Sequence, residues 1–262
     1  MKLGFFPIIS AVMSPSLAFL DEISQRPNRV VRPGDLAGVY SNPAAELKRL
    51  AGQGVLLRLA HGYYAVPPLE WMGNRNWRPS IEATALGIAQ ADHGRDATAL
   101  MGISAARVLE AVPRALSAGV VGVPVRRRPL RTVVGTVHFW HRSVEPLDLQ
   151  AVRTELATGW TTTVCQTLLD LADRPQRADV TLATASEAIW TLATRCDWSH
   201  LRTLAEQQRR RAAYRRARWA AEGIVSDLPP PERGGRPVST RGLRPYRPAN
   251  PSLFGVTDDR RP

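Results

Sequence analysis

Six residues between positions 42 and 61 have side chains suited to contacting nucleic acid. Lysine and arginine bind phosphate oxygens, while amide, carboxylate and guanidinium groups can also pair with base edges. Phosphate contacts supply affinity, and only contacts with base edges select a sequence. The alternative for each residue is an ordinary solvated position on a small domain. The candidate DNA-binding residues are Asn42, Glu46, Lys48, Arg49, Arg58 and His61.

A helix over residues 43–53 would position the first four of these side chains. Asn42 is a candidate N-cap, and Pro43 occupies the favoured first helical position. Gly52 and Gly54 are typical of a helix end. The apolar residues within this range recur at helical spacing and leave the polar ones for another face.

A two-stranded hairpin is expected next, because two apolar runs flank a short glycine-containing turn at residues 60–62. This hairpin would place Arg58 and His61 at or near its tip, and Val30-Val31 could pair with it. The expected order is typical of a winged helix-turn-helix, whose second helix enters the major groove of DNA, although such pieces also serve in protein interactions. Its parts are a helix at 15–25, a helical turn at 33–37, the helix at 43–53 and strands at 55–59 and 63–66.

No pattern of residues predicts an active site. The five histidines form neither HExxH nor another metal-binding pattern. Asp170 and Asp173 fit the boundary of an ordinary amphipathic helix. The chain has no G-x-S-x-G motif and no glycine-rich phosphate loop. We therefore expect no catalytic residue, no cofactor and no metal site, in a protein that is not an enzyme.

Length and composition indicate an α/β (α+β) protein of two domains. The chain has 262 residues, of which 44% are hydrophobic, as is normal for globular proteins. We predict a winged helix-turn-helix DNA-binding domain at residues 14–67, a linker at 68–79 and a mixed domain with a small β-sheet and several helices at 80–223. Residues 224–262 are rich in proline and arginine and predict a disordered basic tail.

Within the mixed domain, β-branched runs between residues 120 and 141 predict strands, whereas residues 149–156 fit either a helix or a strand. From residue 162 onward the pattern is helical again. Helices are expected at 81–91, at 97–109 with a break at Gly102, and at 201–222 as one long element capped by Ser199.

The net charge of +12 indicates a polyanionic partner, but most of the excess lies in residues 207–262, and residues 14–67 are only mildly basic. Arginine runs occur at 126–128, 209–211 and 215–218. Each could dock on nucleic acid or on an acidic protein surface, or could simply be solvated.

Cys165 and Cys196 are the only cysteines, and neither has metal-ligand spacing around it. A disulfide framework and a zinc site are therefore not expected, and a reducing cytoplasm fits best. The uncharged N-terminal stretch raises the question of a signal peptide, but Pro7 and Pro15 interrupt it. We expect residues 1–12 to be a loose extension or an annotation artefact. No stretch is apolar enough to span a membrane, so a membrane partner is not expected.

Three features together resemble the AbiEi-type antitoxins of type IV toxin–antitoxin systems. The first is the hairpin sequence RLAHGYYAV at residues 58–66, and the second is TTTVCQTLLDLADRP, which holds a helix from Thr163. The third is a final arginine-rich helix that follows Trp198. The resemblance extends over roughly residues 15–222, and it concerns the layout and two loose signatures.

The resemblance implies a non-enzymatic bacterial protein with two activities. Its winged domain would bind operator DNA, as inverted repeats in its own promoter, and repress transcription. Its second domain would counteract a cognate nucleotidyltransferase-like toxin, functionally and with or without a direct complex. The alternatives are a transcriptional regulator without a toxin partner and a nucleic-acid-processing enzyme. The absence of lysine from residues 68–262 counts against a nuclease-like enzyme.

Overall fold

The computed structural model describes residues 15–174 and 180–222, and the side chains from residue 20 onward. The expected extension at residues 1–12 and the expected tail at 224–262 lie outside the described residues. The chain divides into two compact units, which are described separately. The first contains residues 1–100 and 115–161, and the second contains 101–114 and 162–262. The boundary between the units therefore divides residues 80–223, which the sequence predicted as one mixed domain. Helices and strands occur in mixture, so the predicted α/β class is confirmed.

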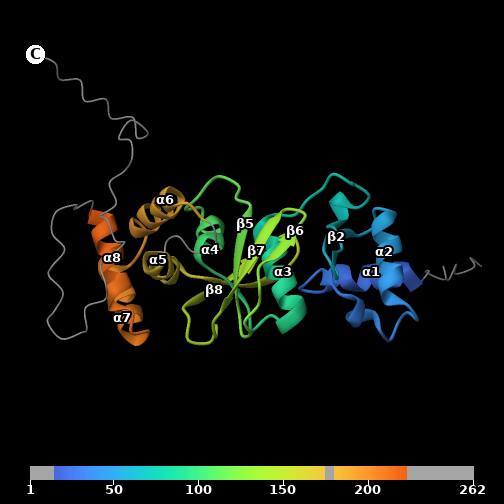
Figure 1. Cartoon of the computed structure of the whole chain (residues 1–262), viewed down its shortest axis with the longest axis horizontal. Helices are drawn as coiled ribbons and strands as arrows, with labels where there is room; N and C mark the ends of the chain where they lie inside the picture. The colour runs from blue at the N-terminus through green and yellow to red at the C-terminus, as the bar shows by residue number, and fades with distance from the viewer. Residues whose placement is uncertain (1–14, 175–179, 223–262) are drawn as a thin grey trace, which may run out of the picture. The chain divides into compact units, whose positions relative to one another are not determined.

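The N-terminal part of the first unit folds as a helix, a helical turn, a helix and a hairpin, in the predicted order (Figure 1). The short strand β1 pairs antiparallel with β3, with Val30 opposite Ala65 and Val31 opposite Tyr64, which confirms the predicted pairing. The elements are α1 (Pro15–Gln25), β1 (Val30–Val31), the 3-10 turn η1 (Pro33–Leu36), α2 (Pro43–Gly52), β2 (Leu57–Ala60) and β3 (Tyr63–Ala65).

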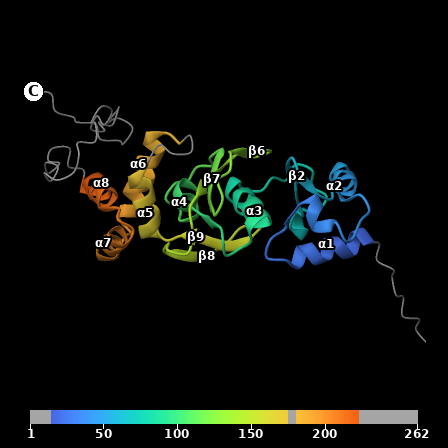
Figure 2. The same ribbon diagram turned by 60° about the horizontal axis from the view of Figure 1, so that its bottom comes forward.

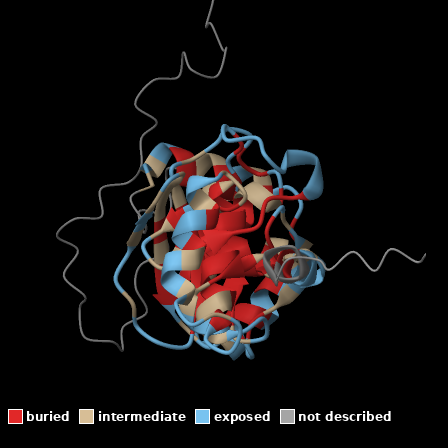
Figure 3. Cartoon of the chain, turned by 90° about the vertical axis from the view of Figure 1, so that its right-hand side faces the viewer, coloured by how far each residue is buried: buried red, intermediate tan, exposed pale blue. Residues whose placement is uncertain are grey.

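Apolar side chains from α1, β1, η1, α2 and β3, with Leu56 just before β2 and Val66 just after β3, share one small core. Figure 3 colours the buried residues red and the exposed outer faces of the helices pale blue. Burying this set is what holds α2 against the hairpin, since apolar surface removed from water contributes about 25 cal/mol per Å². The core contains Leu20, Ile23, Val31, Leu36, Leu47, Leu50, Leu56, Tyr64 and Val66.

The rest of the first unit is a six-stranded sheet with helix α3 (Ile81–His93) packed on it. The strand order is β6-β7-β5-β4-β9-β8, so β6 and β8 form its two edges (Figure 2). Glycines let α3 lie close to the sheet, because a Cβ on Gly119 would come within 2.9 Å of Ile81. The strands are β4 (Ala99–Leu100), β5 (Ala118–Val123), β6 (Leu130–Thr132), β7 (Gly135–His141), β8 (Leu149–Arg153) and β9 (Thr158–Thr162).

Backbone hydrogen bonds join the helix-turn-helix to the sheet within the first unit. The amide of Arg29 donates to the carbonyl of Leu156 at 2.8 Å, and the amide of Thr158 donates to the carbonyl of Pro27 at 2.9 Å. The stretch at 68–79 contains a 3-10 turn, η2 (Leu69–Trp71), and the buried side chain of Trp77. The helix-turn-helix is therefore anchored by backbone contacts as well as by the stretch that follows it.

The second unit consists of five helices in the part of the chain that the structure describes. Helix α5 contacts each of the other four, and nearly all of its residues are buried. Thr163 caps α5 by accepting a hydrogen bond from the amide of Gln166. The helices are α4 (Gly102–Val108), α5 (Val164–Asp173), α6 (Leu182–Ala193), α7 (Trp198–Gln207) and α8 (Arg211–Glu222).

Two predicted helices are wrong in their extent. Residues 97–109 form strand β4 and then helix α4, because the buried residues before Gly102 pair with β5 and β9. The single helix expected at 201–222 is two helices, α7 and α8, and Arg209 between them has a left-handed backbone (φ 55°). Its N-cap is Asp197 rather than Ser199, since the Asp197 carboxylate accepts from the amides of residues 199 and 200.

Candidate nucleic-acid interface

Helix α2 presents a face of small and basic side chains to solvent. Leu47 and Leu50 point into the core, which leaves the opposite side of the helix exposed. A Cβ at Gly52 would have no heavy atom within 4 Å, so nothing crowds this side at its end. Small residues allow close approach of another molecule to the helix backbone. The exposed residues of α2 are Ala44, Ala45, Lys48, Arg49 and Gly52.

The start of α2 confirms the predicted cap. The amide oxygen of Asn42 accepts a hydrogen bond from the amide of Ala45 at 3.2 Å, and Pro43 is the first helical residue. An N-cap of this kind stabilises a helix by about 1 kcal/mol. Because the cap uses the oxygen of Asn42, the NH₂ group of the same exposed side chain is the one directed to other partners.

Arg49 is held by two neighbours on the same helix. Its guanidinium donates to both carboxylate oxygens of Glu46, at 2.8 and 2.6 Å, and to Gln53 at 2.9 Å. The hydrogen bond to Glu46 raises the pKa of Arg49 above its usual value. Lys48 differs, because it is exposed and forms no ion pair with any described residue. Of the two cations on α2, Lys48 is therefore the one without a competing carboxylate.

Arg58 and His61 meet across the hairpin turn. Nη2 of Arg58 lies 3.2 Å from Nδ1 of His61, and both side chains are exposed. A guanidinium can only donate, so Nδ1 accepts and the proton of the neutral ring lies on Nε2. Gly62 has φ 80°, which allows the tight turn between the strands. The hairpin thus exposes one cation and one N–H donor on the same edge.

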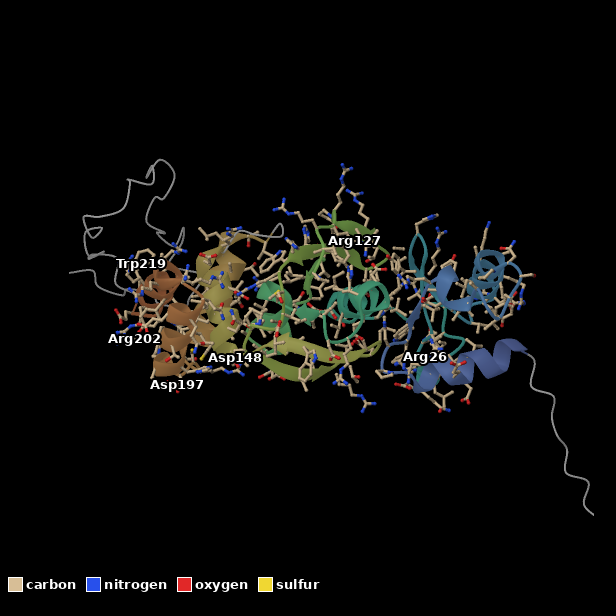
Figure 4. The ribbon with its side chains drawn as sticks, turned by 90° about the horizontal axis from the view of Figure 1, so that it is seen from below. Arg26, Arg127, Asp148, Asp197, Arg202 and Trp219 are labelled. Atoms are coloured by element: carbon tan, nitrogen blue, oxygen red, sulfur yellow. The ribbon has the colours of Figure 1, made fainter. Side chains whose placement is uncertain are left out.

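A cluster that sequence reasoning missed joins the hairpin to the sheet. The Asp92 carboxylate at the end of α3 accepts hydrogen bonds from the Tyr63 hydroxyl at 2.9 and 2.8 Å and from Arg32 at 3.0 Å. Arg127 pairs with the same carboxylate and donates to the Tyr63 hydroxyl at 2.9 Å. Its guanidinium also lies 4.3 Å from the centre of the Phe139 ring. We call Arg32, Tyr63, Asp92 and Arg127 the Asp92 cluster (Figure 4, where Arg127 is labelled).

The charges of the Asp92 cluster are largely removed from solvent. The Asp92 side chain is 14% exposed, and that of Arg127 is 24% exposed. Burial, together with the hydrogen bond to Asp92, raises the pKa of Tyr63 despite the opposing effect of Arg127. The phenol is therefore neutral at pH 7 and can donate to Asp92. In the sequence, only the arginine run at 126–128 pointed to this cluster, and it did not indicate that Asp92 is the partner of Arg127.

In two arginine runs that were candidates for docking, one residue of each makes contacts within the protein, while the other arginines are exposed. Arg210 pairs with Asp170 and, at 2.8 Å, with Asp173. Arg216 donates to the carbonyl oxygen of Ala172 at 2.7 Å and pairs with Asp173 at 3.0 Å. The Asp170 side chain is 1% exposed, so it is a buried ion-pair partner and not the boundary residue that we expected.

Neither a metal-binding group nor a membrane-spanning helix occurs among the described residues. Within residues 15–174 and 180–222, no group of three or more histidine, cysteine, aspartate or glutamate side chains could hold a metal ion. Across the same ranges, every helix is too short or too polar to cross a bilayer.

Comparison with protein families identifies the helix-turn-helix. Residues 19–67 match a family model described as a transcriptional regulator, AbiEi antitoxin. This segment is similar to the AbiEi antitoxin family. It holds α2, the hairpin and all six candidate DNA-binding residues, and it is called the AbiEi segment below. A search of curated proteins found no match to the chain. The AbiEi segment indicates a transcriptional regulator of antitoxin type, as the resemblance implied.

Proposed function

We propose that this protein is the DNA-binding antitoxin of a type IV toxin–antitoxin system and represses its own operon in the bacterial cytoplasm. The observation that supports this proposal most directly is the exposed face of α2, where Lys48 and Arg49 lie between small residues of the AbiEi segment. A helix of this kind can enter a major groove, and Arg49 can pair with a guanine edge if it leaves Glu46. Occupation of the promoter would then block transcription sterically.

The hairpin supports the same mode of binding. Arg58 and His61 are exposed beside each other at the turn, where a cation and an N–H donor can reach phosphate oxygens. Inverted repeats would require two copies of the α2 surface on paired half-sites. Asn42 would contribute its NH₂ group, and Glu46 would accept from a cytosine amine or release Arg49.

The decisive experiment is an anisotropy titration of the full chain on its own upstream DNA and on random DNA, at two salt concentrations. We expect tighter binding to the upstream DNA. The variant K48Q/R49Q/R58Q should lose at least tenfold in affinity for that DNA, because a lost base contact of Arg49 costs roughly 1–3 kcal/mol and the phosphate contacts of the other two cations are lost as well. The control is R153Q/R211Q/R215Q, which removes three exposed arginines from other elements.

Equal, salt-sensitive binding to both DNAs would contradict sequence-specific repression. Loss of binding in the control alone would place the interface on β8 or α8, which carry the three control arginines.

The antitoxin half of the proposal concerns a nucleotidyltransferase-like toxin. We expect the adjacent reading frame to encode such a protein, and co-expression of this chain to restore growth. Rescue by the K48Q/R49Q/R58Q variant would show that neutralisation does not depend on DNA binding. A neighbouring frame of another kind, or a failure of rescue, would leave a transcriptional regulator without a toxin partner. The proposal also makes the chain a non-enzyme, so purified protein should leave operator DNA uncleaved.

A further inference from the structure

Three exposed arginines lie at the β6 edge of the sheet, outside the AbiEi segment. Arg126 and Arg128 are in the loop before β6, and Arg131 is on the strand itself. None of the three forms an ion pair with another residue that the structure describes. The surrounding sequence has no acidic residue between Glu110 and Glu145. These three residues are called the β6 arginines.

The β6 arginines lie next to the hairpin of the AbiEi segment. The amide of Val133, directly after β6, donates to the carbonyl of Leu59 on β2 at 2.9 Å. Arg127 makes a second connection, because it reaches the Tyr63 hydroxyl on β3. Both contacts are within the first compact unit. Figure 4 shows nitrogen-tipped side chains extending away from the ribbon beside the labelled Arg127.

The inward turn of Arg127 explains why its neighbours face solvent. Arg127 is drawn onto Asp92 and the Phe139 ring, and the residues before and after it point outward. The hairpin side has the same charge character, since no acidic residue occurs between Glu46 and Glu70. The Asp92 carboxylate, which does reach this region, is bound by two arginines and a tyrosine. The hairpin and the β6 stretch therefore both carry an excess of basic over acidic residues, which favours a polyanionic partner.

We propose that Arg126, Arg128 and Arg131 extend the DNA contact from the hairpin onto the edge of the sheet, by binding phosphates of the same duplex. This rests on the proposed function, because the helix-turn-helix must bring the duplex to this surface. The β6 arginines add affinity without selecting sequence, since phosphate contacts are equal on all sequences. The hairpin and the β6 arginines then form one continuous surface that binds the DNA phosphate backbone.

The test is the salt dependence of binding by full-length R126Q/R128Q/R131Q, with Arg127 left intact. Each lost phosphate contact lowers the slope of log affinity against log salt by about 0.9, so we expect a change of about 2.7. Wild type should then lose about 40-fold more affinity than the variant between 50 and 200 mM salt. The ratio of affinities for upstream and random DNA should stay unchanged.

Two controls make the result specific. R153Q removes one exposed arginine from β8, at the opposite edge of the same sheet, and is the match for R131Q. We expect R131Q to lower the slope and R153Q to leave it as in wild type. The variant R126K/R128K/R131K keeps the charge and should retain the wild-type slope, which separates phosphate binding from a structural role of the guanidinium groups.

The outcomes distinguish this inference from the function on which it rests. If wild type shows no preference for its upstream DNA, the proposed function fails. If wild type shows the preference and R126Q/R128Q/R131Q has the wild-type slope, the inference alone is overturned. A lowered slope in the lysine variant, or an equal change in R153Q, would also overturn it.

Discussion

Two runs of three consecutive arginines, in different units of the molecule, follow the same pattern. Arg127 and Arg210 are the middle residues, and each turns inward onto carboxylates. Both flanking residues of each run are exposed. A dense arginine run is therefore not a uniform basic surface, because its middle residue is a structural contact and its flanks remain available for a partner.

The two runs differ in how deeply their carboxylates are buried. Asp92 is 14% exposed and shares its oxygens among two arginines and a tyrosine. Asp170 is 1% exposed, and Asp173 beside it is 29% exposed. A charge left alone in the interior costs far more than one that water can reach. The difference predicts that loss of Arg210 affects folding, while loss of Arg127 affects mainly the hairpin.

The largest effect is expected from Arg210→Ala. Removing it leaves Asp170 buried without its ion pair, which typically costs about 3–5 kcal/mol. Urea unfolding followed by circular dichroism measures the loss. Its control is Arg211→Ala, an exposed neighbour expected to stay within about 0.5 kcal/mol of wild type. Equal stabilities of the two variants would contradict the comparison.

A smaller effect is expected from Arg127→Ala. The variant loses hydrogen bonds to Asp92 and Tyr63 and the contact with Phe139. Together these losses should lower the free energy of unfolding by about 2 kcal/mol. The same unfolding measurement applies, with Arg126→Ala as the control. DNA affinity should also fall, because the hairpin loses an anchor. The comparison would not hold if Arg127→Ala destabilised the protein as strongly as Arg210→Ala.

Acid should weaken the contacts of the second run. Burial on its own would raise the pKa of Asp173, but the hydrogen bond and charge of Arg210, with the charges of Arg216 and Arg174, lower it. A carboxylate with a lowered pKa contributes stability above the pKa of the unfolded chain, near 3.8, and loses it as pH falls through the folded value. The free energy of unfolding should therefore fall below pH 4 more steeply in wild type than in Asp173→Asn. Parallel pH profiles would argue against this contribution.

The smallest effect on stability is expected from Glu46→Gln, which breaks a pair on the exposed face of α2. This ion pair contributes little, because water reaches the Arg49 side chain, which is 49% exposed, even though Glu46 is 18% exposed. The free energy of unfolding should match that of wild type within error. Binding to the upstream DNA should become tighter, since Arg49 is released and a negative charge near the phosphates is lost. Weaker binding would instead indicate that the Glu46 carboxylate itself contacts a base.

The sequence alone determined much of the AbiEi segment. The cap at Asn42, the proline at the first turn of α2 and the glycine in the hairpin turn act on neighbouring residues, so their effects can be read locally. The pairing of β1 with the hairpin followed from two valines and was also confirmed. The candidate DNA-binding residues lie where these elements placed them, and their role stays a prediction.

Only the tertiary structure decided which charged residues are partners. Asp92 meets Arg32 and Arg127 from 60 and 35 positions away, and Asp170 meets Arg210 from 40. Such contacts depend on how the elements pack, which neither spacing nor propensity encodes. The break before α8 has the same origin, because Arg210 turns toward α5 there.

The two cysteines are a further case in which packing brings distant residues together. Cys165 and Cys196 are distant in sequence, yet each thiol lies 3.5 Å from the carbonyl oxygen of Asp197. A hydrogen bond with Cys165, and burial, raise the pKa of Cys196. Local signals are sufficient where neighbours in sequence are neighbours in space. Where elements from separate parts of the chain meet, packing alone selects the partners.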